Sequence, residues 1–225
     1  MTPPRAPAAR FDMQRGARAT VVALALGGAA LFAGAYFLPW WNFHLVAPQY
    51  PRGLELHIAL TGISGDTKEI DILNHYIGMR AMSGAADFEA KMAIYLVGAV
   101  VLTVFAGLVA AGKRLHRLAM IPAIGLPIGF VADVFGWMWT FGHSLNPEAT
   151  IHFEALTPTL LGKGMVGQFH TTAWPAMGFG VALLGVGFVI AAAVLRARVC
   201  NTCPYGAKCG ATCPHVLVFA PEPPK

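Results

Sequence analysis

The segment MAIYLVGAVVLTVFAGLVAA, residues 92–111, is the clearest indication of fold class in this chain, because its twenty residues include no charged side chain. About 20 apolar residues in a helix are enough to cross the hydrocarbon core of a bilayer. Residues 20–40 and 175–195 have the same character. Residues 118–141 are also apolar apart from Asp133, and they contain two prolines, which membrane helices tolerate because neighbouring helices satisfy the freed backbone groups. We therefore predict four transmembrane helices.

The composition of the whole chain supports this interpretation. Of its 225 residues, 56% are hydrophobic and only 12% are charged, and the mean hydropathy is +0.58. A soluble globular domain has about 25% charged residues. We therefore expect the lipid bilayer to surround much of this protein.

Basic residues are distributed unevenly between the connections. Eleven of the sixteen lysines and arginines lie in the N-terminal segment, in the connection after residue 111 and in the C-terminal tail, whereas most acidic residues lie in the other connections. Cytoplasmic segments of membrane proteins carry the excess of lysine and arginine. The pattern predicts a multi-pass protein with both termini in the cytoplasm. The formal charge of +5 then reflects topology, and we expect no nucleic-acid partner.

These assignments divide the chain into three parts. Residues 1–19 are predicted to be a disordered cytoplasmic N-terminus. Residues 20–195 form the transmembrane domain, with exoplasmic loops at 41–91 and 142–174. Residues 196–225 form a cytoplasmic tail that contains all four cysteines.

The two exoplasmic loops differ in pattern. The segment LELHIALTGI, residues 54–63, alternates apolar and polar side chains, which is typical of a strand. The segment TPTLLGKGMVGQFH, residues 157–170, has enough glycine to indicate an interfacial or re-entrant segment. The predicted fold class is therefore an all-α membrane protein, with four transmembrane helices, a small β-rich exoplasmic cap and a Cys-rich cytoplasmic tail.

Candidate metal ligands occur in the first exoplasmic loop, around IDILNHYIGM, residues 70–79. If this segment is helical, His75, Met79 and Met82 project from one face at positions i, i+4 and i+7. Imidazole and thioether are soft ligands, so we predict copper before zinc, with His57 and His44 as completing ligands. The alternative is that histidine suits the membrane interface and that methionine fills apolar gaps.

A second candidate metal site lies in the tail. Its cysteines have the spacing C-x2-C-x5-C-x3-C, and they are Cys200, Cys203, Cys209 and Cys213. Four cytosolic thiols so close together predict a zinc or cuprous site or an iron–sulfur cluster, although the central spacing departs from the ferredoxin pattern. The alternative is a palmitoylated or solvent-exposed tail.

Asp133 lies near the centre of the window at residues 118–141. An ionisable group at that depth is costly and is a functional candidate, as a proton relay or as part of a cation path. The alternative is a neutral acid that forms a hydrogen bond across helices.

One resemblance extends these predictions. The segments YPRGL, residues 50–54, and ISGDTKEIDILNHYIGM, residues 63–79, resemble the exoplasmic segment of small multi-span bacterial membrane proteins found alongside components of copper-enzyme maturation and denitrification, such as those serving nitrous oxide reductase. The resemblance covers this loop and the helix pattern, and not the tail. It implies copper handling or respiratory-enzyme assembly at the bacterial inner membrane, with another membrane or periplasmic protein as partner.

Three functions are consistent with the sequence, and none of them is that of an enzyme acting alone, because no nucleophile–base arrangement, acid pair or P-loop is present. The first is copper handling at the exoplasmic face. The second is a haem or quinone anchor of a respiratory complex, although no histidine lies within the four apolar windows. The third is a structural subunit, whose fourth helix has glycines that allow another helix to approach closely. These glycines are Gly178, Gly180, Gly185 and Gly187.

Overall fold

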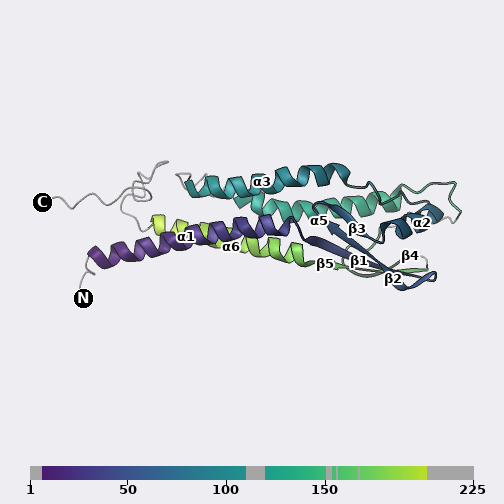
Figure 1. Ribbon diagram of the computed structural model, residues 1–225, viewed down its shortest axis with the longest axis horizontal. Coiled ribbons are helices and arrows are strands. Elements are labelled where there is room, and N and C mark those ends of the chain that lie inside the picture. The colour runs from purple at the N-terminus through teal and green to yellow at the C-terminus, as the bar shows by residue number, and fades with distance from the viewer. Residues whose placement is uncertain (1–6, 110–119, 151–153, 156, 167, 202–225) are drawn as a thin grey trace. The chain divides into compact units, whose positions relative to one another are not determined.

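The structure is a computed structural model that describes residues 7–109, 120–150, 154–155, 157–166 and 168–201 (Figure 1). The helices are α1 (Pro7–Ala35), α2 (Thr67–Ile77), α3 (Asp87–Val109), α5 (Met120–His143) and α6 (Met177–Asn201). The strands are β1 (Pro39–Ala47), β2 (Tyr50–Ala59), β3 (Gly62–Gly65), β4 (Gly162–Val166) and β5 (Phe169–Pro175).

The chain forms two compact units. The first, which we call the helical unit, comprises residues 1–31, 99–124 and 184–225. The second, which we call the sheet unit, comprises residues 32–98 and 125–183 and contains all five strands together with α2. Helices α1, α3, α5 and α6 contribute residues to both units.

Three helices in the described part of the chain are long and apolar enough to cross a membrane, at Asp87–Leu108, Met120–His143 and Met177–Arg198. They match the predicted windows at residues 92–111, 118–141 and 175–195, and they identify the chain as a membrane protein by length and composition.

The prediction of four transmembrane helices with a small cap is wrong. The described apolar part of α1, Ala19–Ala35, is shorter than the three candidate spans, and the window at residues 20–40 does not continue as one helix. Strand β1 begins at Pro39, and the residue before a proline is disfavoured in the helical conformation. Helix α1 also begins at Pro7, within the segment predicted to be disordered.

The sheet is larger than the predicted cap because both loops that were predicted to be exoplasmic contribute strands to it. Its five antiparallel strands have the order β3-β2-β1-β5-β4, with β1 in the centre. The alternating segment at residues 54–63, predicted as a strand, forms the end of β2 and the start of β3, with a turn between them at residues 60–61. The segment at residues 157–170, predicted to be interfacial or re-entrant, contains β4 and the start of β5, which pair as a hairpin. Gly164 in β4 has a structural role, because the absence of a Cβ there allows the side chain of Thr159 to approach the strand.

The two faces of the sheet differ in chemistry. Residues opposite each other on paired strands lie on the same face. On the inner face Phe43 pairs with Leu56, and Leu45 with Leu54, and these side chains pack against α2 through Ile70. The outer face has polar pairs instead, His44 with Glu55 and Asn42 with His57. Because His44 and His57 point to the outer face, their side chains lie on the opposite side of the sheet from the apolar inner face.

Trp40 anchors the start of the sheet to helices within the sheet unit. Its side chain is fully buried, and its Nε1 donates a hydrogen bond to the carbonyl oxygen of Ala35 at 2.8 Å. Its ring lies 4.9 Å from that of Phe130 and 5.9 Å from that of Phe179, between centroids. Gly178 leaves room for it, because a Cβ there would lie 2.6 Å from Trp40 Cδ1.

Within the helical unit, α1 and α6 pack closely and α6 contacts α3. A Cβ at Gly28 would lie 2.9 Å from Val189 Cγ2 and 3.2 Å from the carbonyl oxygen of Gly185. The guanidinium of Arg196 donates hydrogen bonds to the carbonyl oxygens of Gly107 and Leu108, near the C-terminus of α3.

Candidate functional site

A cavity of about 90 Å³ lies within the sheet unit, between the inner face of the sheet, α2 and the C-terminal part of α5. Phe43, Leu54, Leu56 and Phe169 line it from the strands, and Phe141 lines it from α5. Its walls carry no charged side chain. The cavity is therefore an apolar site in which polar or sulfur atoms would be the specific groups.

Three methionines line this cavity. Met79 and Met82 come from the loop after α2, and Met138 comes from α5. Met138 is only 4% exposed, and Met82 also packs against the buried cluster formed by the sheet and α2. The fold thus brings three thioethers from two distant segments to one cavity.

The end of α2 determines where Met79 and Met82 lie. Gly78 follows the helix with φ +76°, and the amides of Gly78 and Met79 donate hydrogen bonds back to the carbonyl oxygens of His75 and Asn74. Two such hydrogen bonds, together with a glycine in the left-handed conformation, are typical of the C-terminal end of a helix. The predicted helical stripe of His75, Met79 and Met82 is therefore wrong, because both methionines lie beyond the helix.

Side chains of α2 hold the loop that follows it. Both oxygens of the Asp71 carboxylate accept backbone hydrogen bonds, one from the amide of Met82 and the other from the amide of Ser83 at 3.1 Å. The buried Asn74 donates from Nδ2 to the carbonyl oxygen of Arg80 at 3.3 Å. These contacts fix the backbone of the loop beside the cavity.

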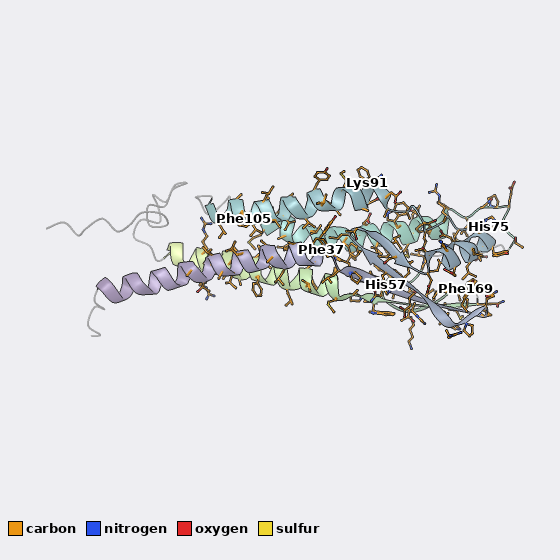
Figure 2. All side chains as sticks on the ribbon, viewed as in Figure 1. Phe37, His57, His75, Lys91, Phe105 and Phe169 are labelled. Atoms are coloured by element: carbon orange, nitrogen blue, oxygen red, sulfur yellow. The ribbon has the colours of Figure 1, made fainter. Side chains whose placement is uncertain are left out.

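The histidines do not join the methionines. His75 is exposed on α2 and does not line the cavity, and its ring contacts Tyr76 with centroids 6.2 Å apart (Figure 2). His44 is among the residues that line the cavity, but strand alternation places its side chain on the outer face, where its ring lies next to Gly53. His57 is also on the outer face (Figure 2).

The outer face has a small polar network. His57 Nδ1 donates a hydrogen bond to Asn42 Oδ1 at 2.8 Å, and its Nε2 lies 3.7 Å from Glu55 Oε2. Within the described ranges, no three His, Cys, Asp or Glu side chains gather as a metal-binding group. The sheet therefore lies between the ring of His57 and the predicted thioether ligands, whereas His75 is on the same side as the methionines but points away from the cavity as an exposed residue of α2.

One hydroxyl at the cavity has no protein partner. Thr171 lines the cavity from β5, and its Oγ1 is buried without a hydrogen bond to another described residue. A buried polar group without a partner costs about 1–3 kcal/mol. Thr159 lines the same part of the cavity, next to Gly164. This end is the polar part of an otherwise apolar site.

Sequence reasoning missed Met138 and Thr171. Met138 lies between two tryptophans of an apolar window, and Thr171 lies one residue after the segment predicted to be interfacial or re-entrant. Neither has a local pattern that distinguishes it from its neighbours. Only the tertiary fold brings them to Met79 and Met82.

The other candidate residues lie elsewhere. Asp133 is on α5, partly exposed, and does not line the cavity. Cys203, Cys209 and Cys213 lie outside the described residues, and only the backbone of Cys200 is described, at the end of α6. No family model and no curated protein matches the sequence.

Proposed function

We propose that this protein binds copper as Cu(I) at the exoplasmic face of a bacterial inner membrane and assists its transfer to, or the assembly of, a respiratory metalloenzyme. The observation that supports this proposal is that Met79, Met82 and Met138 line one cavity. The partner is another membrane or periplasmic protein, and the protein itself does not catalyse a reaction.

The chemistry of the cavity favours a soft monovalent ion. Thioether sulfur is a neutral, soft donor that selects Cu(I) over the harder divalent ions. The cavity walls supply no negative charge to balance a cation. Because the Born cost of burying an ion grows with the square of its charge, a divalent ion would cost roughly four times as much as a monovalent one.

The size of the cavity favours an ion over the haem or quinone alternative. An apolar cavity of about 150 Å³ accommodates one benzene molecule. The cavity here is about 90 Å³, which is less than one aromatic ring of that size requires. A single metal ion is small enough for a cavity of this volume, whereas a haem or quinone ring is not.

Charge asymmetry supports the exoplasmic assignment. The positive-inside rule favours the cytoplasm for the short connection after residue 111, which carries Lys113, Arg114 and Arg117 and no acidic residue. The segment between α5 and α6, which contributes β4 and β5 to the sheet, then lies on the outer side. We include the cysteine cluster of the tail in the proposal as a cytoplasmic site for zinc, cuprous ion or an iron–sulfur cluster.

The test is Cu(I) binding by the full chain in detergent, under anaerobic conditions, with total copper, zinc, iron and haem quantified. We expect one Cu(I) in the sheet unit of the wild type. Replacing Met79, Met82 and Met138 together by leucine removes three sulfurs while nearly conserving volume, so the fold should persist. Cu(I) affinity should then fall by more than about tenfold, because the variant has lost all three proposed thioether ligands.

Two control variants sharpen this test. Met165→Leu replaces a methionine that is 68% exposed and does not line the cavity, so it should leave Cu(I) affinity unchanged. Cys200→Ser with Cys203→Ser should remove only metal bound by the tail. Unchanged Cu(I) affinity in the triple methionine variant would refute the proposal. Absence of copper and haem from every preparation would instead favour a structural subunit.

A further inference from the structure

The loop that carries two of the three methionines has no regular secondary structure, so something else must fix its backbone. It begins at Gly78, whose carbonyl oxygen accepts a hydrogen bond from the amide of Asn146 at 2.8 Å. It then passes Met79 and Met82 before α3 begins at Asp87. Its start is thus held by the end of α2 and by the segment after α5.

Asp71 holds the other side of this loop. Its carboxylate accepts hydrogen bonds from two consecutive amides, those of Met82 and Ser83, through separate oxygens. Hydrogen bonds to an ionised acceptor are stronger than neutral ones. Two such bonds fix both the position and the direction of the backbone at Met82. They therefore determine whether its side chain enters the cavity.

We infer that Asp71 is a positioning residue for the copper site, an inference that rests on the proposed function. Its carboxylate keeps the thioether of Met82 in the cavity, next to those of Met79 and Met138. Asp71 itself does not line the cavity and does not bind the ion. Without the carboxylate, the two amides are satisfied by water, the loop moves, and the site keeps two sulfur ligands in place of three.

Asp66 provides a matched control. Its carboxylate also accepts a backbone hydrogen bond, from the amide of Glu55 at 2.8 Å, and its own amide donates to the carbonyl oxygen of Glu55 at 2.8 Å. Asp66 thereby joins β2 to the start of α2, and it does not line the cavity. A general loss of stability would affect Asp66→Ala and Asp71→Ala alike, whereas loss of ligand positioning is specific to Asp71.

The test measures Cu(I) affinity and the number of sulfur neighbours, by X-ray absorption at the copper edge, in the full chain in detergent. We expect Asp71→Ala to lower Cu(I) affinity by about tenfold or more, since one of three ligands is lost, and to reduce the copper–sulfur number from three to two. Asp71→Asn keeps one acceptor oxygen, so its affinity should be intermediate. Asp66→Ala should keep both the wild-type affinity and three sulfurs.

A second measurement separates this inference from the proposed function. Hydrogen exchange in copper-free protein should be faster at the amides of Met82 and Ser83 in Asp71→Ala than in the wild type. If the wild type binds no Cu(I), the proposed function fails, while exchange still reports whether Asp71 holds the loop. Three sulfurs with unchanged affinity in Asp71→Ala, or unchanged exchange at both amides, would overturn the inference.

Discussion

Substituting alanine for Gly78 should destabilise the sheet unit more than the same substitution at Gly84. Both glycines have left-handed backbones, with φ +76° and +84° respectively. An L-residue in that conformation costs roughly 1–2 kcal/mol. Their surroundings differ, because a Cβ at Gly78 would lie 2.8 Å from both Ala149 Cβ and the carbonyl oxygen of Asn146, whereas a Cβ at Gly84 would meet nothing within 4 Å.

Both variants place alanine in a left-handed conformation, so the difference between their free energies of unfolding measures the cost of the steric contact alone. Overpacking of this kind costs about 1–3 kcal/mol. Gly78→Ala should therefore reduce the free energy of unfolding by about 2 kcal/mol more than Gly84→Ala. For a chain of this length, each 1 kcal/mol lowers the Tm by roughly 2–4 °C, so the Tm values of the two variants should differ by about 4–8 °C.

The assay is thermal unfolding of both variants and the wild type in one detergent, followed by tryptophan fluorescence. Both variants should keep helix content at low temperature, which far-ultraviolet circular dichroism checks. Equal Tm values for Gly78→Ala and Gly84→Ala would refute the close packing of α2 against the segment at Asn146. A wild-type Tm for both would refute the left-handed turn as well.

Two further predictions concern the helices. Gly178→Ala should destabilise the chain by about 1–3 kcal/mol and lower the Tm, because its Cβ would lie 2.6 Å from Trp40 Cδ1. Gly180→Ala should change the Tm little, because a Cβ there would meet nothing within 4 Å. Equal Tm values for the two variants would contradict the packing around Trp40. Arg196→Gln should destabilise the chain by about 1.5–3 kcal/mol, because it removes the charged hydrogen bonds to the carbonyl oxygens of Gly107 and Leu108. An unchanged Tm in the same assay would show that these hydrogen bonds do not contribute to stability.

The membrane helices were predictable because each is a continuous apolar window. The window at residues 20–40 wrongly predicted a transmembrane helix. Apolar and aromatic residues continue through Trp40 and Trp41, but these residues are buried within the protein as the start of β1 rather than in a span. Hydropathy reports that a side chain avoids water. It does not distinguish lipid from the protein core.

The candidate ligands were only partly predictable. Met79 and Met82 were identified because they lie close together in the sequence, and both line the cavity. His75 was grouped with them through an assumed continuous helix, which Gly78 ends. Met138 was missed because no local pattern links it to the loop, and the two come together only in the cavity of the folded sheet unit.

The order of the strands has a consequence for how the protein is made. Strand β1 is near the beginning of the chain, yet its neighbour β5 follows α3 and α5, as in the pairing of Asn42 with Trp174. Contacts between such distant segments form late in folding. The ribosome has therefore produced two of the three candidate membrane helices, α3 and α5, before β5 can join the sheet. A chain that lacks β5 also lacks Phe169 and Thr171 of the cavity wall, so the cavity is completed only after these two helices have been made.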